Sequence, residues 1–190
     1  NHHICEESLN DLSPINSTYR LLNINTKEQI LLAPGCFLPT LNSQKFNLAG
    51  QTFDCLETDA PSSDILKTAS LFLGTPYLWG GKSIYGIDCS GFVQMVFSAH
   101  DISLPRDSGP QSLVAAKTGY FELEIGDLVF FSNEIGKVFH VGIVSGENEV
   151  IHASASVHKD RFTKEGIFNS SNELTHAFAW GIKKSSLKKK

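Results

Sequence analysis

The sequence lacks the features that mark a membrane-spanning, zinc-ribbon or disulfide-rich protein. No apolar run in its 190 residues approaches the roughly 20 residues that a helix needs to cross a bilayer. None of its four cysteines belongs to a CxxC pair, so zinc-ribbon and thioredoxin-type redox motifs are excluded. A disulfide among Cys5, Cys36 and Cys55 stays open, although we expect Cys36 and Cys55 to be small, buried, apolar residues.

Charge is also scarce, at 19% of residues against 41% hydrophobic, which is typical of a globular chain. Five of the last eight residues are lysine, so the rest of the chain holds 11 basic against 20 acidic residues. Because this acidic body carries no basic stripe, we expect no nucleic-acid partner. Residues 184–190 form a basic tail that could adhere to an anionic polymer, but a solvated, frayed terminus is the simpler expectation.

The chain divides into two regions of different pattern. In residues 1–60, short apolar segments recur about every ten residues between turn residues, which favours a small β-barrel or meander. These segments are 19–24, 29–32, 45–48 and 51–56. Residues 59–63 form a linker to a domain over 61–183. The chain starts at Asn1 rather than methionine, so we expect that a leader or upstream segment has been removed.

Helices precede strands in the second region. Helices are predicted over 63–74 with Ser62 or Ser63 as the cap, from 89 to about 100, and near 109–117. Strands are predicted at 126–131, 138–144, 149–153 and 177–182. Helices followed by an antiparallel sheet make an α+β domain.

Cys89 lies at the start of an apolar helix. The apolar positions 92, 93, 96 and 97 form one helical face, and Asp88 is the expected N-cap. The first helical position offers the helix dipole and unpaired N–H groups to an anion, so we expect the Cys89 thiolate to be stabilised. The alternative is a structural cysteine beside an ordinary helix cap.

A cysteine nucleophile needs a base, and that base needs a group that holds its tautomer. Only His140 and His152 fall inside predicted strands, whereas His158 and His176 fall in loop-like sequence. A three-residue hairpin loop at 145–147 would place His140 directly opposite His152, about 5 Å apart at Cβ. We therefore expect His140 to take the thiol proton and His152 to orient it.

Two histidines that face one another need not be catalytic. Either could be a hydrogen-bonded polar group of the core, and the pair could bind a metal ion. No carboxylate or thiolate at ligand spacing completes a zinc set near them, so we expect no metal.

Six sequence blocks carry a family resemblance. They are Gly74-Thr75-Pro76-Tyr77-Leu78-Trp79-Gly80-Gly81, Gly86-Ile87-Asp88-Cys89-Ser90-Gly91-Phe92-Val93-Gln94, Leu104-Pro105-Arg106-Asp107-Ser108 with Gln111, Gly126-Asp127-Leu128-Val129-Phe130-Phe131, His140-Val141-Gly142-Ile143-Val144 and Ile151-His152-Ala153. In this order and at this spacing, the region from about residue 65 to 182 resembles the NlpC-type family of bacterial cell-wall cysteine peptidases.

The resemblance implies a papain-like α+β core, in which a cysteine on a helix packs against an antiparallel sheet. It implies a catalytic triad of Cys89, His140 and His152 that needs no cofactor. Many members cleave the bond between γ-D-glutamyl and a diamino acid in peptidoglycan stem peptides, through a thioester. An amidase or acyltransferase on the same core, or a non-catalytic cell-wall-binding protein, are the alternatives.

Some members require a free N-terminal L-alanine, and for these the resemblance implies substrate binding by Asp88, Ser90 and Ser108. It also implies that Tyr77 lies beside the cysteine and helps to polarise the scissile carbonyl. Asp88 could equally serve as a helix cap alone, and the two serines could fill ordinary first-turn and N-cap roles.

Two further residues of these blocks have structural expectations. We expect Arg106 to pair with an acidic neighbour rather than with a substrate carboxylate, and Trp79 to lie in the core.

The N-terminal region resembles the bacterial SH3-type barrels that often precede such catalytic domains, although about 60 residues are few for a complete barrel. In relatives, such a barrel helps to wall off the site and restricts it to short, free-ended peptides. A peptidoglycan peptide substrate implies the cell envelope, either periplasm or cell surface, with cytoplasmic peptide recycling as the alternative.

Overall fold

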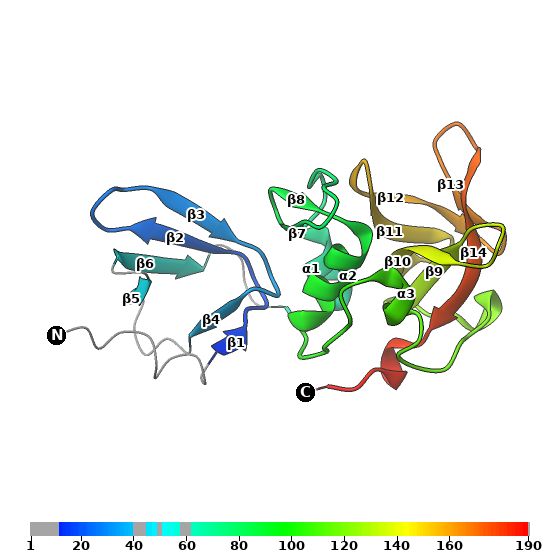
Figure 1. Ribbon diagram of the computed structural model, residues 1–190, viewed down its shortest axis with the longest axis horizontal. Coiled ribbons are helices and arrows are strands. Elements are labelled where there is room, and N and C mark those ends of the chain that lie inside the picture. Colours follow the sequence, from blue (N-terminus) through cyan, green and yellow to red (C-terminus); the bar gives the residue numbers. More distant parts are fainter. Residues whose placement is uncertain (1–11, 40–44, 49–50, 58–61, 190) are drawn as a thin grey trace.

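The computed structural model describes residues 12–39, 45–48, 51–57 and 62–189. Its N-terminal part consists of short strands: β1 (Leu12–Pro14), β2 (Tyr19–Asn23), β3 (Gln29–Leu32), β4 (Phe37–Pro39), β5 (Lys45–Leu48) and β6 (Gln51–Glu57). They form a four-stranded antiparallel sheet in the order β3-β2-β6-β5 and a separate pair, β1-β4 (Figure 1).

All four strands predicted in this region are therefore confirmed. The described strands form an open sheet and a pair rather than a closed barrel, so the SH3-type resemblance is not confirmed. Most of the expected linker, Asp59 to Pro61, lies outside the described residues, as do Cys5 and the basic tail's last lysine. The domain boundary at residue 60 thus stays a prediction. Cys55 is buried, as expected, whereas Cys36 is only partly buried.

The second part begins with the helices α1 (Ile65–Ser70), α2 (Cys89–Ser98) and α3 (Ser108–Gln111) and the hairpin β7-β8 (Lys82–Ser83, Gly86–Ile87). Six longer strands follow: β9 (Leu128–Ser132), β10 (Val138–Gly146), β11 (Glu149–Ser154), β12 (Ser156–Thr163), β13 (Gly166–Phe168) and β14 (Leu174–Ile182). Single 3-10 turns cover Tyr120–Glu122 and Lys184–Ser186.

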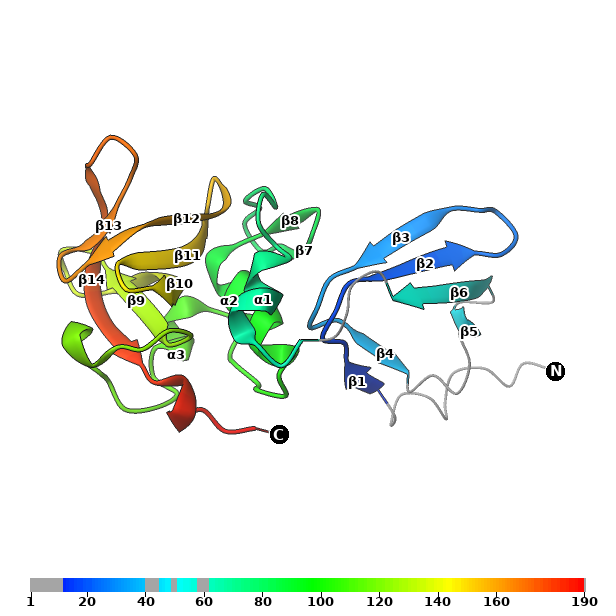
Figure 2. The same cartoon turned by 180° about the vertical axis from the view of Figure 1, so that it is seen from behind.

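The six long strands close into an antiparallel barrel in the order β10-β11-β12-β13-β14-β9. Helix α2 packs against β10 and β11 and occupies the space between the barrel and the N-terminal strands (Figures 1 and 2). The α+β prediction is thus confirmed in outline. The domain contains more strand than predicted, because β12 and β13 were not foreseen.

The predicted apolar face of α2 forms the main core. Phe92, Val93, Val96 and Phe97 are fully buried, in one cluster with Phe130 and other barrel residues. Burial of each such side chain contributes about 1.5–3 kcal/mol, so the start of α2 is held firmly against the barrel. The N-cap of α1 is Asp64, whose carboxylate accepts from the Leu66 N–H, and not Ser62 or Ser63 as predicted.

The N-terminal strands contact the second part directly. Gly35 has a φ of +85° and approaches the backbone of Met95 in α2 so closely that a Cβ would not fit. The Leu31 N–H donates to the Tyr85 hydroxyl at 3.4 Å. The two parts are therefore held together by backbone contacts as well as by side chains.

The expectation of a frayed C-terminus is wrong for residues 183–189. Lys183 Nζ lies 2.9 Å from Glu124 Oε1, and the Lys184 N–H donates to Asp127 Oδ1 at 2.8 Å. Lys189 forms a β-bridge with Ile102. These contacts fasten residues 183–189 to the segment before β9 and to the loop after α2.

No helix among the described residues is both long enough and apolar enough to span a membrane.

Candidate active site

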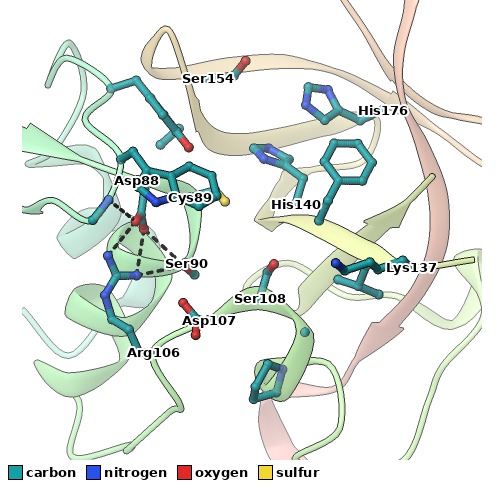
Figure 3. Close-up of a pocket in the computed structure, with 18 of the residues that line it drawn as sticks. Asp88, Cys89, Ser90, Arg106, Asp107, Ser108, Lys137, His140, Ser154 and His176 are labelled. Atoms are coloured by element: carbon teal, nitrogen blue, oxygen red, sulfur yellow. Dashed lines mark hydrogen bonds and ion pairs between the residues drawn. The ribbon is translucent and has the colours of Figure 1, made fainter.

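A cavity of about 810 Å³ opens between the start of α2, the loop before α3 and the strands β10, β11 and β14 (Figure 3). Six of the seven predicted site residues line it: Tyr77, Asp88, Cys89, Ser90, Ser108 and His140. The seventh, His152, is buried behind His140. The structure therefore brings the whole predicted set together.

Cys89 occupies the first position of α2, as predicted, and Asp88 caps the helix by accepting from the Gly91 N–H at 2.7 Å. The thiol is buried, and burial raises its pKa to about 11, even though hydrogen bonding from the backbone of Val141 and Ser90 lowers it. The prediction that the helix terminus favours the thiolate is therefore wrong. Desolvation of the anion exceeds the effect of the helix N-terminus.

His140 lies on β10 and faces Cys89, whose sulfur points toward it across the cavity (Figure 3). Burial, together with the neighbouring His152, holds the pKa of His140 well below its ordinary value. At neutral pH the pair is therefore an uncharged imidazole beside an uncharged thiol.

His140 and His152 are in direct contact, with 2.8 Å between His140 Nε2 and His152 Nδ1. The predicted register is wrong by two residues, because Gly142, and not His140, pairs with His152. The strand β10 continues to Gly146 through a bulge after Val144, so the turn lies at 147–148 and not at 145–147 as expected. A shift of two residues keeps side chains on the same face, so the histidines still meet diagonally across the strands.

A further carboxylate, which was not predicted, lies next to His152 and extends the row of side chains formed by Cys89, His140 and His152. His152 Nε2 lies 3.3 Å from Asp160 Oδ2, on the neighbouring strand β12. Hydrogen bonding to His152 is the main cause that lowers the pKa of Asp160, so the group is a carboxylate at neutral pH. The sequence offered no alternation to find this strand, because Val157 and Phe162 are five residues apart with only polar residues between them.

The two histidines assigned to loops lie on strands. His158 belongs to β12, and His176 belongs to β14, where it lines the cavity. The ring of His176 lies 4.2 Å from that of His140, centroid to centroid, with an angle of 33° between the planes. His176 thus covers one side of the His140 ring.

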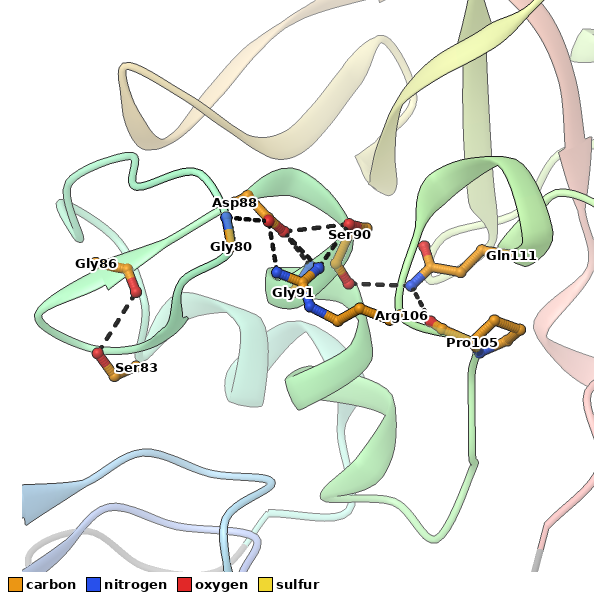
Figure 4. A network of polar contacts seen from close by, with 9 residues as sticks. All are labelled: Gly80, Ser83, Gly86, Asp88, Ser90, Gly91, Pro105, Arg106 and Gln111. Carbon is orange, nitrogen blue, oxygen red and sulfur yellow. Dashed lines mark hydrogen bonds and ion pairs between the residues drawn. The ribbon is translucent and has the colours of Figure 1, made fainter.

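Asp88 is engaged by more donors than its two oxygens ordinarily accept. Oδ1 accepts from the Gly91 N–H, the Ser90 hydroxyl and Arg106 Nη1, and Oδ2 accepts from the Gly80 N–H and Arg106 Nη2 (Figure 4). A carboxylate offers about four lone-pair sites. The expected ion pair of Arg106 is confirmed, and it leaves Asp88 no free acceptor for a ligand.

The ion pair should make the stability of the protein depend on pH. Burial alone would raise the pKa of Asp88, but the Arg106 guanidinium and the Gly91 and Gly80 N–H groups hold it below its ordinary value. A lowered folded-state pKa stabilises the protein above the unfolded pKa, about 3.9, and the contribution is lost as pH falls through the folded value. We expect Arg106→Gln to lower the free energy of unfolding by about 1–3 kcal/mol at pH 7 and by less near pH 3.

Urea denaturation at the two pH values measures this difference. Arg20→Gln is the matched control, because Arg20 is exposed on β2 and should change stability by less than about 0.5 kcal/mol. The same loss at both pH values for Arg106→Gln would contradict a role through the Asp88 carboxylate.

The rim of the cavity holds residues whose roles were not predicted. Trp79, expected in the core, is 85% exposed and lines the cavity. Asp107 is the N-cap residue of α3, yet its side chain makes no capping hydrogen bond, and it too lines the cavity. Within the part of the chain that the structure describes, Asp107 has no ion-pair partner, so it is the free carboxylate of the cavity.

Comparison with known proteins gives one consistent result. A model of the NlpC/P60 family matches residues 74–173. The gamma-D-glutamyl-L-lysine dipeptidyl-peptidase of Bacillus cereus ATCC 10987 is 41% identical over 107 residues, covering 54% of this chain and 32% of that protein. The enzyme of the same name from Bacillus subtilis 168 is 36% identical over 116 residues, covering 60% of this chain and 39% of that protein.

The matches thus span about a third of the length of these two relatives. Among solved structures, a crystal structure of an NlpC/P60 family protein from Bacillus cereus ATCC 10987 superposes with a TM-score of 0.74 at 26% identity. It covers 94% of this chain and 66% of that one, so the similarity in fold includes the N-terminal strands.

Proposed function

Because this chain belongs to the NlpC/P60 family, we propose that it is a cysteine peptidase that hydrolyses peptidoglycan stem peptides. Cys89 is the proposed nucleophile, His140 the base and His152 the residue that orients the base. The observation that carries the proposal is the row from Cys89 through His140 and His152 to Asp160, built into the wall of a cavity.

Asp160 sets the tautomers of the row. An ionised carboxylate only accepts, so His152 Nε2 carries the proton and its Nδ1 is left as an acceptor. His140 Nε2–H then donates to His152 Nδ1, and His140 Nδ1 keeps a free lone pair. In this arrangement His140 can accept a proton from the thiol, which is what a general base requires.

The reaction starts from the neutral pair. As the Cys89 sulfur attacks the scissile carbonyl carbon, its proton passes to His140, and the carbonyl oxygen becomes an oxyanion. The Cys89 backbone N–H and the Tyr77 hydroxyl are proposed to stabilise that charge. His140 gives the proton to the leaving amine, the C–N bond breaks, and water, deprotonated by His140, hydrolyses the thioester.

The bond proposed for cleavage joins γ-D-glutamate to the diamino acid of a stem peptide with a free N-terminal L-alanine. The names of the two Bacillus relatives describe release of a dipeptide before L-lysine, which supports this choice. Since Asp88 is fully engaged, Asp107 is the carboxylate that we assign to the substrate ammonium group, with Ser90 and Ser108 beside it.

Mass spectrometry of digests of L-Ala-γ-D-Glu-L-Lys tests the proposal. We expect cleavage after D-glutamate, and N-acetylation of the alanine should lower kcat/KM by at least about 10–100-fold, because it removes a charge-assisted hydrogen bond. Asp107→Asn should cause a similar loss on the free peptide and little further loss on the acetylated one.

Asp101→Asn is the matched control, because Asp101 is exposed and has a φ of +62°, which asparagine adopts readily. Equal cleavage of free and acetylated peptides would refute recognition of the free end. No cleavage of either peptide would refute the proposed substrate.

A peptidoglycan peptide as substrate leads us to propose the cell envelope as the place of action. Peptides recovered from the wall and hydrolysed inside the cell are the alternative, and the products of hydrolysis would be the same in both.

A further inference from the structure

The first observation concerns the hydrogen bonds of His158. Its Nδ1 lies 2.8 Å from the carbonyl oxygen of Ser156, and a carbonyl only accepts, so this nitrogen must carry a proton. In the neutral ring, Nε2 is then an acceptor, and it lies 3.1 Å from the carboxylate oxygen Oδ2 of Asp160. Two acceptors that face one another at this distance repel unless a cation or a second proton lies between them.

A third side chain, His152, offers a possible metal-ligand atom close to His158 and Asp160. His152 pairs directly with His158 across β11 and β12, and Asp160 follows two residues later on β12, so all three side chains share one face. Their ligand atoms lie within 4.8 Å of one another. The Asp160 oxygen is 3.3 Å from His152 Nε2 and 3.1 Å from His158 Nε2.

The two separations from Asp160 match the edges of a zinc coordination shell, and the third, between the two imidazole ligand atoms, lies within 4.8 Å. With zinc–nitrogen and zinc–oxygen bonds of about 2.0–2.1 Å, tetrahedral geometry places neighbouring ligand atoms about 3.3 Å apart. Two imidazoles and one carboxylate are typical zinc ligands, with water in the fourth position. The expectation that no carboxylate completes a zinc set is therefore wrong, because it did not foresee β12.

Solvent can reach the site through the partly exposed side chains of His158 and Asp160. The side chain of His152 is 1% exposed, but those of His158 and Asp160 are 37% and 20% exposed. An ion could thus enter past His158 and contact the buried end of the row without passing through the substrate cavity.

We propose that His152, His158 and Asp160 bind a divalent ion of the zinc class, and that this ion inhibits hydrolysis by changing the tautomers of His152 and His140. Metal on His152 Nε2 displaces the proton from that nitrogen, so neutral His152 must carry it on Nδ1 and donate to His140 Nε2. The His140 proton then sits on Nδ1, the nitrogen that must accept the thiol proton. The effect on rate rests on the proposed function, whereas the binding does not.

Binding is measured on Cys89→Ala, which removes the competing thiol ligand. We expect Zn²⁺, titrated against a chromophoric chelator, and Co²⁺, followed by its visible absorption, to bind this variant. Addition of His158→Ala should weaken binding more than about 100-fold, since the loss of a ligand exceeds the 10–100-fold cost of losing a ligand's supporting partner. His100→Ala, which removes a histidine just after the C-terminal end of α2, should leave binding unchanged.

Activity is then compared in the presence and absence of Zn²⁺. Zn²⁺ should lower kcat of the unmodified chain at least about tenfold and EDTA should restore it, while His158→Ala keeps its basal rate and resists Zn²⁺. Equal inhibition of the unmodified chain and of His158→Ala by Zn²⁺ would place the ion on the Cys89 thiol and overturn the proposal. Binding that is lost in Cys89→Ala but kept in His158→Ala would do the same. No binding by any variant would show that a proton fills the site, and would overturn it too. A chain without hydrolytic activity that still binds Zn²⁺ through His158 would refute the proposed function and leave the metal site standing.

Discussion

Replacement of Cys89 by alanine should abolish hydrolysis of the stem peptide, with a fall in kcat of at least about 10⁴-fold, while the fold stays intact. The sulfur is the atom that would form the thioester, and no neighbouring side chain can take its place. Alanine fits the same small volume at the start of α2, so the helix and its Asp88 cap should remain. Product formation by mass spectrometry and far-UV circular dichroism together measure the two expectations.

Cys55→Ala is the matched control, because Cys55 is also a buried cysteine but lies in the N-terminal sheet. Its rate should equal that of the unmodified chain. Turnover retained by Cys89→Ala would remove this residue from the mechanism.

The second large effect is expected in the row behind His140. His152→Ala should lower kcat about 10²–10⁴-fold with little change in KM, because His140 loses the group that holds its proton on Nε2. Asp160→Asn should lower kcat about 10–100-fold, since the amide oxygen can still accept from His152 in one of its two orientations. Steady-state kinetics on the free tripeptide separates kcat from KM.

A merely structural role would give a different pattern. Loss of packing around His152 would raise KM and lower the free energy of unfolding together with kcat, and His100→Ala serves as the control for loss of a partly buried histidine. A near-wild-type rate for His152→Ala would exclude it from the triad.

The predicted contact between His140 and His152 is present although the predicted register of their strands was wrong. Strand residues alternate between two faces, so a shift by an even number of residues keeps both side chains on the same side. Local sequence patterns thus predicted which face each histidine occupies. They could not predict the bulge after Val144, because a bulge depends on how the strand pairs with its neighbours.

The strands β12 and β13 were missed for a related reason. Residues 158–161 are all polar, and such a segment resembles a loop until its pairing with β11 is known. Asp160 therefore could not be connected with His152 from the sequence, since the contact joins side chains on adjacent strands.

The shift in the pKa of the Cys89 thiol was predicted in the wrong direction. A helix N-terminus is visible in the sequence, but the burial of the thiol against β10 depends on tertiary packing. Trp79 shows the converse, because a large aromatic residue is assigned to the core by type and yet lies at the rim of a cavity. The burial of single residues was therefore harder to predict than the secondary structure around them.

The closure of the second part into a six-stranded barrel has a consequence for self-association. A closed barrel has no edge strand, so among the described residues β9 to β14 offer no row of free backbone groups to another chain. Among the residues that the structure describes, the N-terminal sheet is open and ends in β3 and β5, which therefore provide the template for edge-to-edge pairing. When this protein is concentrated or partly unfolded, aggregation should begin at the N-terminal sheet and not at the part that carries the site.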